Sequence, residues 1–223
     1  MAELHWISDG KTDRGRFIKI ASAIHPLTDY IHLREKTMSA RELMAVAAEL
    51  LAAGVPAAKL VINDRIDVAL AAGACGVQLA WHSLPPAAAR TAAPRLRLGV
   101  SVHSSAEAAE AGRQGADYCM YGHVFPSVCK PGQSERGLQQ LCEAVRSSVI
   151  PLIAVGGIEP GNAAEILEQG AAGIAVMSGI GSAADPVAAA AAYRQAVDKA
   201  GFMKTLNSVQ AAAKGVKRHE SDH

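Results

Sequence analysis

The sequence predicts an α/β fold, a single (β/α)8 TIM barrel, on three observations. Eight short apolar runs alternate with Ala-rich amphipathic segments, one helix-to-strand joint recurs three times, and no Gly-x-Gly-x-x-Gly motif follows the first run. Each run has strand length and is bounded by turn or cap residues. The runs are Leu4–Ser8, Tyr30–Arg34, Leu60–Asn63, Gly76–Leu79, Leu98–Val102, Tyr118–Val124, Leu152–Gly156 and Gly173–Ser178.

Helix signals lie between these runs. Ser39–Glu42 and Ser104–Glu107 have the pattern of a capping box, in which the first and fourth residues exchange hydrogen bonds. Asp185–Pro186 predicts an N-cap followed by proline at the first helical position. Glycines that suit helix C-caps stand at Gly54, Gly73, Gly115 and Gly170.

The recurring joint favours one architecture for the whole chain. Gly73–Val77, Gly115–Tyr118 and Gly170–Ile174 each run from a helix cap through a short turn into a strand. Eight such units in about 200 residues describe a compact barrel, near the lower size limit of that fold. A doubly wound open sheet is the alternative, and it is disfavoured because the glycine motif of its first turn is missing.

The chain divides into a barrel and a tail. Residues 1–201 form the predicted TIM-barrel catalytic domain, because no composition shift marks an earlier boundary. Residues 202–223 are rich in lysine, and we expect a frayed helix or disorder there, with no chemistry.

Composition excludes several classes of function. The 223 residues carry 22 Lys+Arg against 21 Asp+Glu, a formal charge of +1, and only 4% are aromatic. This balance offers no electrostatic attraction for nucleic acid or an anionic membrane, and few rings on which bases could stack. No run approaches the ~18 apolar residues of a membrane span. The sequence therefore predicts neither nucleic acid nor membrane as a partner.

The cysteines indicate a reducing compartment. Cys75, Cys119, Cys129 and Cys142 form no Cys-x-x-Cys pair and no zinc-type spacing with histidine. A chain of this size does not need disulfides, and its N-terminus lacks the basic and apolar regions of a secretion signal. We expect reduced thiols and a cytoplasmic location.

A barrel of this kind carries its active site at the C-terminal ends of the strands, with phosphate often held after the seventh and eighth. Gly156, Gly157, Ser178 and Gly179 stand at those two ends. Glycine lets backbone N–H groups approach an anion, and a following helix N-terminus favours negative charge. The alternative is that these glycines only turn tight corners. Their shared position at the predicted phosphate end favours binding.

A second cluster is cationic. Arg34 and Lys36 follow the second run, and alternation would point both into the barrel mouth if the strand persists. Lys130, after the sixth run, could join them. Such cations favour a carboxylate or a second phosphate as ligand, although an ion pair with Glu35 would also explain Arg34 and Lys36. Substrate contacts are also predicted for two further residues at strand ends, Asn63 and Ser101.

His123 is the candidate for proton transfer. It ends the sixth run, in Gly122–Phe125. Imidazole is the side chain that exchanges protons near neutrality, so it suits general acid/base catalysis. A lone histidine near a strand end is more often structural, so the residue type alone does not decide.

Motifs around His123 resemble a known family. Gly122–Phe125, Cys129–Lys130 and Arg136–Gly137 resemble the thiazole tautomerase (TenI) family. The likeness runs from about Leu4 to Ala196. It includes Ile31–Lys36, Ile153–Ile158 and Gly173–Ile180, of which the last two are shared with the sister thiamine phosphate synthases.

Acidic residues separate the two families. A synthase joins a pyrimidine pyrophosphate to a thiazole phosphate, and its pattern places one carboxylate after the third strand and one after the fourth for Mg²⁺. Asp64 matches the first position, but Ser83 stands at the second. The synthase Gly-Pro, Thr-x-Thr-Lys and Gln-x-Arg motifs are also altered, to Gly122–His123, Ser127–Lys130 and His32–Arg34. We expect Asp64 to survive as a helix N-cap.

The resemblance thus implies an isomerase of thiamin biosynthesis, without metal or cofactor. It would convert a carboxythiazole phosphate tautomer to the aromatic carboxythiazole phosphate, with His123 as the general acid/base. Two alternatives stay open: a thiamine phosphate synthase, and a non-catalytic sensor of thiazole or thiamin phosphates. The expected partner is a phosphorylated thiazole, and a synthase would take the pyrimidine pyrophosphate as well. A homodimer is a reasonable expectation for a small barrel.

Overall fold

The structure is a computed structural model that describes residues 1–126 and 134–219. Of residues 203–219 it describes the backbone only. The predicted site residue Lys130 and its neighbour Cys129 lie outside the described residues.

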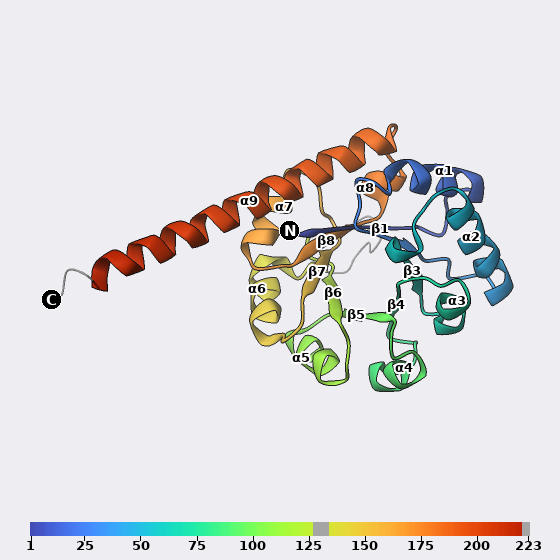
Figure 1. Ribbon diagram of the computed structural model, residues 1–223, viewed down its shortest axis with the longest axis horizontal. Coiled ribbons are helices and arrows are strands. Elements are labelled where there is room, and N and C mark those ends of the chain that lie inside the picture. The colour runs from blue at the N-terminus through green and yellow to red at the C-terminus, as the bar shows by residue number, and fades with distance from the viewer. Residues whose placement is uncertain (127–133, 220–223) are drawn as a thin grey trace.

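Eight parallel strands close into one barrel in chain order, which confirms the predicted fold class (Figure 1). Each predicted run overlaps one strand, and the ends differ by at most two residues. The strands are β1 (Glu3–Ile7), β2 (Tyr30–Leu33), β3 (Leu60–Asn63), β4 (Gly76–Leu79), β5 (Arg97–Val102), β6 (Tyr118–Gly122), β7 (Leu152–Val155) and β8 (Gly173–Val176). β1 pairs with both β2 and β8, so the barrel has no open edge.

Helices surround this barrel. They are α1 (Arg14–Ile24), α2 (Ala40–Ala52), the 3₁₀ helix η1 (Ala57–Lys59), α3 (Ile66–Ala71), α4 (Pro86–Ala92), α5 (Ser105–Arg113), α6 (Gly137–Ser147), α7 (Ala163–Glu168), α8 (Ser178–Gly181) and α9 (Pro186–His219).

Two of the predicted helix starts are confirmed in full. Ser39 and Glu42 exchange both capping-box hydrogen bonds. Asp185 caps α9 by accepting hydrogen bonds from two backbone N–H groups of its first turn. At α5 only half of the box forms: Ser104 accepts from the Glu107 N–H, while the Glu107 carboxylate accepts from the backbone N–H of His103.

The outward-facing side chains of the strands pack on the helices in one large apolar core. The inward-facing side chains fill the barrel itself, and there the composition is mixed. An apolar group contains Ile7, Tyr118, Met120, Ile153 and Ala175. Beside it His5, His32 and Gln78 are buried polar side chains. Since barrel interiors are usually filled by bulky aliphatic residues, the polar side chains need a specific explanation.

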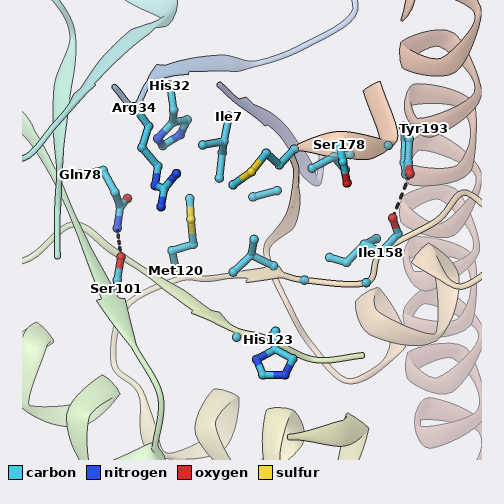
Figure 2. Close-up of a pocket in the computed structure, with 18 of the residues that line it drawn as sticks. Ile7, His32, Arg34, Gln78, Ser101, Met120, His123, Ile158, Ser178 and Tyr193 are labelled. Atoms are coloured by element: carbon cyan, nitrogen blue, oxygen red, sulfur yellow. Dashed lines mark hydrogen bonds between the residues drawn. The ribbon is translucent and has the colours of Figure 1, made fainter. Parts of the chain in front are cut away.

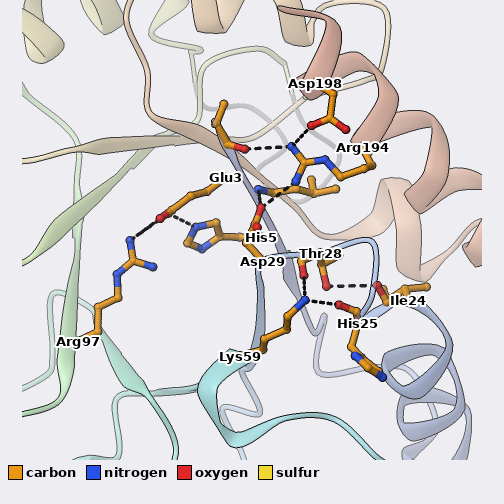
Figure 3. A network of polar contacts seen from close by, with 12 residues as sticks. Glu3, His5, Ile24, His25, Thr28, Asp29, Lys59, Arg97, Arg194 and Asp198 are labelled. Carbon is orange, nitrogen blue, oxygen red and sulfur yellow. Dashed lines mark hydrogen bonds and ion pairs between the residues drawn. The ribbon is translucent and has the colours of Figure 1, made fainter. Parts of the chain in front are cut away.

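The last helix, α9, contacts the N-terminal segment of the chain and then extends away from the barrel. Arg194 of α9 binds the Asp29 carboxylate and the Ala2 carbonyl, and the same carboxylate accepts from the backbone N–H of Leu4 (Figure 3). The predicted boundary at residue 201 lies inside this continuous helix, whose C-terminal part projects beyond the barrel (Figure 1). No helix in the described part of the chain is long and apolar enough to cross a membrane.

Candidate active site

A cavity of about 600 Å³ lies at the C-terminal ends of the strands. Residues from the strand ends and the following loops line it, as the barrel geometry predicts. Figure 2 shows Arg34, His32, Gln78 and Ser101 on one side and Ser178, Ile158 and Tyr193 on the other. Eight of the predicted site residues line this one cavity: Arg34, Asn63, Ser101, His123, Gly156, Gly157, Ser178 and Gly179.

The paired glycines after β7 have a packing role of their own. Gly156 has φ +99°, and a Cβ there would lie 2.2 Å from the Cβ of His123. Gly157 has φ +64°, and its Cβ would lie 2.4 Å from the Pro126 carbonyl oxygen. Both positions therefore require glycine for the loops after β6 and β7 to meet, whether or not an anion binds. Phosphate binding at this pair stays a prediction.

Gly179 is required for a different reason. Its Cβ would lie 2.2 Å from the Tyr193 hydroxyl, which donates a 2.9 Å hydrogen bond to the Ile158 carbonyl. Tyr193 belongs to α9 and is not among the site residues that the sequence predicts, because no feature of an Ala-rich helix indicates that one of its tyrosines lines a cavity. Ser178 and Gly179 open α8, where the first N–H groups of a helix have no intrahelical partner.

Of the predicted cationic cluster, Arg34 lies at the cavity and Lys36 lies away from it. Arg34 lines the cavity, and its backbone N–H donates to the Ser8 hydroxyl at 2.8 Å. Lys36 is exposed and is not among the lining residues. β2 ends at Leu33, so the two-residue alternation that would have aligned Lys36 with Arg34 does not continue.

His123 follows β6 directly and is 5% exposed. The Gly122–His123 peptide bond is cis. The backbone on both sides is held, because the His123 carbonyl accepts from the Arg136 N–H at 3.0 Å and the Val124 N–H donates to the Val155 carbonyl at 3.0 Å. His123 therefore forms a fixed part of the cavity wall beside Gly156.

Side chains within the strands complete the cavity. His32 lines it and is 1% exposed, and Gln78 donates from Nε2 to the Ser101 hydroxyl at 3.1 Å. Attention to strand ends alone misses Gln78. The available signal is a polar residue within an otherwise apolar run, which alternation can place inside the barrel.

Asp64, the acidic residue that follows β3, does not have the role that the sequence predicts. The N-cap of α3 is Arg65, without a side-chain hydrogen bond, so the prediction that Asp64 caps a helix is wrong. The Asp64 carboxylate instead accepts from the Ser83 hydroxyl at 2.5 Å, and its second oxygen lies 3.8 Å from Nε2 of His82. The loop after β4 thus reaches back to the loop after β3, because the two strands are neighbours.

This pair suits a weakly held hard cation. Within the described residues no three His, Cys, Asp or Glu side chains gather as a metal site. Mg²⁺, however, is commonly bound by one or two carboxylates together with substrate phosphates. Asp64 supplies one carboxylate and Ser83 a hydroxyl oxygen, so the donor set fits Mg²⁺ in the company of a phosphorylated ligand.

Comparison with known proteins identifies the family. A family model described as thiamine monophosphate synthase (TMP-TENI) matches residues 4–180. The chain belongs to this family. The match spans every strand of the barrel.

Two relatives are named thiamine-phosphate synthase. The thiamine-phosphate synthase of Chloroflexus aurantiacus is 41% identical over 202 residues, which is 87% of this chain and 92% of the relative. That of Pyrococcus furiosus is 44% identical over 138 residues, 62% of this chain and 67% of the relative. A solved structure described as thiamine phosphate pyrophosphorylase from Pyrococcus furiosus has a TM-score of 0.77 at 34% identity, covering 89% of this chain and 96% of that one. A 3-hexulose-6-phosphate synthase at 21% identity and TM-score 0.72 shares the fold.

These findings correct the predicted reaction. The assignment as a thiazole tautomerase is wrong, because relatives at about 40% identity over most of the chain are named thiamine-phosphate synthase, the alternative reading. Four local departures, among them His123 and Ser83, weigh less than the likeness of the whole barrel.

Proposed function

We propose that the chain is a thiamine-phosphate synthase, which transfers a hydroxymethylpyrimidine group from its pyrophosphate to a thiazole phosphate. The observation that carries this proposal is the 41% identity to a relative of that name over 87% of the chain. The cavity supports it, since about 600 Å³ suits a small two-ring ligand and the lining includes an arginine and two glycine corners.

The transfer balances without a proton. The thiazole nitrogen donates its lone pair to the pyrimidine methylene carbon, a C–N bond forms, and the C–O bond to pyrophosphate breaks with its electrons on oxygen. The result is thiamine phosphate and pyrophosphate. Because no proton moves, a general acid/base is not required, and we assign His123 to contact with the ligand.

Positioning and charge are what the chain must supply. Arg34 is proposed to bind the pyrophosphate, since a guanidinium matches phosphate oxygens in a planar fork. Gly156, Gly157, Ser178 and Gly179 are proposed to hold the thiazole phosphate through backbone N–H groups and one hydroxyl. Asn63 and Ser101 remain proposed polar contacts to the rings. The cavity wall at Ile158 and Tyr193 helps to keep water away from the reacting carbon.

Asp64, with Ser83 beside it, would hold Mg²⁺ against the phosphorylated substrate. When bound, Mg²⁺ neutralises charge that develops on the leaving pyrophosphate. One carboxylate in place of two predicts that this chain needs more Mg²⁺ than a two-carboxylate relative.

The test is product formation by the purified protein. With hydroxymethylpyrimidine pyrophosphate, thiazole phosphate and Mg²⁺, thiamine phosphate and pyrophosphate are expected in equal amounts. Asp64→Asn should lower the rate more than about tenfold at limiting Mg²⁺, whereas Asp67→Asn, an exposed acid that pairs with Arg65, should not. Tight binding of thiamine phosphate without turnover would replace the synthase with a binding protein.

A cytoplasmic location and a homodimer stay predictions. Sedimentation of the purified protein decides the second.

A further inference from the structure

A column of polar side chains runs inside the barrel from its N-terminal end to the cavity. Four side chains form it: Glu3 and His5 of β1, His32 of β2 and Arg97 of β5 (Figure 3 shows Glu3, His5 and Arg97). His5 and His32 are 0% and 1% exposed. Buried polar groups are costly unless hydrogen-bonded, and an apolar column would often serve stability as well.

The hydrogen bonds of this column form one continuous chain. Nε2 of His5 lies 2.9 Å from a Glu3 carboxylate oxygen, and Nδ1 of His5 lies 2.9 Å from Nε2 of His32. Arg97 donates to both Glu3 oxygens at 3.0 Å, and its guanidinium lies over the rings of Tyr30 and Tyr118 at 4.3 and 4.5 Å. Glu3 is therefore held as an ionised acceptor at the base of the chain.

The Glu3 carboxylate determines which atom donates and which accepts in each of the following hydrogen bonds. An ionised carboxylate only accepts, so Nε2 of His5 carries a proton. Both imidazoles are neutral, since burial lowers the pKa of His5, and burial together with the positive charge of Arg97 lowers the pKa of His32 well below its ordinary value. Nδ1 of His5 is then an acceptor, Nε2 of His32 carries a proton, and Nδ1 of His32 keeps a bare lone pair.

The hydrogen-bond series from Glu3 through His5 ends at an atom of His32 that has no partner in the part of the chain that the structure describes. Among the described residues, Nδ1 of His32 is a buried side-chain nitrogen without a hydrogen-bond partner, and His32 lines the cavity. Oε1 of Gln78 and the Tyr118 hydroxyl are also buried without a partner in the described ranges, and both lie 2.3 Å from the point where a Gly99 Cβ would be. The two atoms therefore share the space beside Gly99 within the barrel wall, and Tyr118 does not line the cavity. His32 is thus the better candidate for a ligand contact.

We propose that Glu3 and His5 are positioning residues that fix His32 in the tautomer with an unprotonated Nδ1, so that the cavity accepts a hydrogen bond there from an N–H donor on the ring of its ligand. The tautomer does not depend on the reaction catalysed. The choice of thiamine phosphate as the donor-bearing ligand rests on the proposed function.

The first experiment reads the tautomer directly. ¹⁵N spectra of histidine-labelled, ligand-free protein at about pH 7.5, above the ordinary pKa of histidine, should show Nδ1 of both His5 and His32 unprotonated. Glu3→Gln should give a mixture at His32, because an amide can accept from or donate to His5 and so permits both directions of the chain. The matched control Glu110→Gln, at an exposed acid paired with Arg113, should leave the spectrum unchanged. A protonated Nδ1 of His32 in the wild type, or no change in Glu3→Gln, overturns the proposal.

The second experiment adds thiamine phosphate as the probe. Its binding should shift the ¹⁵N resonance of His32 Nδ1, and Glu3→Gln should weaken affinity by about tenfold, the value of one hydrogen bond. In a His32→Gln background the same Glu3→Gln change should have no further effect on affinity, because a glutamine side chain has no tautomer to fix. Binding that leaves the His32 resonance in place, or additive effects of the two changes, contradicts the proposal.

Two outcomes separate this proposal from the proposed function. If Glu3→Gln does not fold, the wild-type spectra with and without thiamine phosphate still decide. Failure of thiamine phosphate to bind wild type counts against the proposed function, and the ligand-free tautomer then decides the role of Glu3 and His5.

Discussion

The two ends of the barrel interior are built differently. At the N-terminal end the charged side chains bind one another: Glu3 accepts from His5 and Arg97, and Arg97 lies over two tyrosine rings. At the C-terminal end Arg34, Gln78 and Ser101 line an open cavity. The polar groups of the first end therefore bind one another and reach a ligand only through His32, whereas those of the second line the cavity directly. Changes at the first end should act mainly on the free energy of unfolding, and changes at the second mainly on binding.

The largest expected effect is at Arg97. Arg97→Met leaves the Glu3 carboxylate beside His5 without its cation and should lower the free energy of unfolding by about 3 kcal/mol. The control is Arg113→Met, whose guanidinium is 68% exposed and pairs with Glu110. That change should cost less than about 0.5 kcal/mol, as exposed pairs do. Urea unfolding followed by circular dichroism measures both, and equal effects would mean that the Glu3–Arg97 pair stabilises the fold no more than an exposed ion pair does.

The histidines of the column make stability depend on pH. The pKa values of His5 and His32 are lowered in the folded state, so below their ordinary pKa of 6.5 the unfolded chain binds protons that the folded chain does not. The free energy of unfolding should then decrease as the pH decreases below about 6.5, by up to about 1.4 kcal/mol per pH unit for each histidine.

Glu3 adds to this loss at lower pH. Burial raises the pKa of Glu3, but hydrogen bonds from His5 and Arg97 and the charge of Arg97 outweigh burial and lower it, so the contribution of Glu3 is lost as pH falls below its ordinary pKa of 4.5. His32→Gln should reduce the slope between about pH 6.5 and 5 by about one proton. An unchanged slope would mean that His32 is charged in the fold.

At the other end, Gly156 tests the wall of the cavity. Gly156→Ala places a methyl group 2.2 Å from the Cβ of His123 at φ +99°, which should cost about 2 kcal/mol of stability and displace His123. Thiamine phosphate affinity should fall along with it. Gly161→Ala is the matched control in the same loop, since nothing lies within 4 Å of its Cβ. If both variants bind like wild type, the contact between the β6 and β7 loops does not shape the site.

Local signals in the sequence predict the fold and the outline of the site. Strand runs and helix caps depend on neighbouring residues alone, so the barrel and the eight cavity residues at strand ends are predictable. Tyr193 and Gln78 are not, because the place of Tyr193 depends on how α9 packs and that of Gln78 on which face of a strand turns inward. Lys36 lies away from the cavity because β2 ends at Leu33, and a strand end cannot be read to one residue from composition.

The reaction is the weakest inference from sequence because it depends on single positions. Ser83 in place of a carboxylate suggests the loss of a metal site, yet its hydroxyl lies 2.5 Å from the Asp64 carboxylate and leaves an oxygen-lined pair. One substitution changes the number of carboxylates without removing the site. Identity over 202 residues is the stronger guide to the reaction, since it reports on the whole cavity.

Ser83→Asp is the smallest predicted change and the most direct test of this pair. A second carboxylate beside Asp64 should repel the first without metal and attract Mg²⁺, so affinity for Mg²⁺ should rise about tenfold. In the presence of a chelator, the midpoint temperature of thermal unfolding of Ser83→Asp should be lower than that of the wild type. Added Mg²⁺ should restore it, because a cation that binds only the folded state stabilises that state. Ser147→Asp, which adds the same charge on an exposed position of α6, should show neither effect.

Calorimetry with Mg²⁺ alone measures this affinity without any turnover. A rise in affinity for Ser83→Asp would indicate that the pair of Asp64 and Ser83 is one carboxylate short of a strong metal site. No rise would mean that the loops after β3 and β4 do not present their oxygens to one cation, and the hydrogen bond between Ser83 and Asp64 would then serve only to join those two loops.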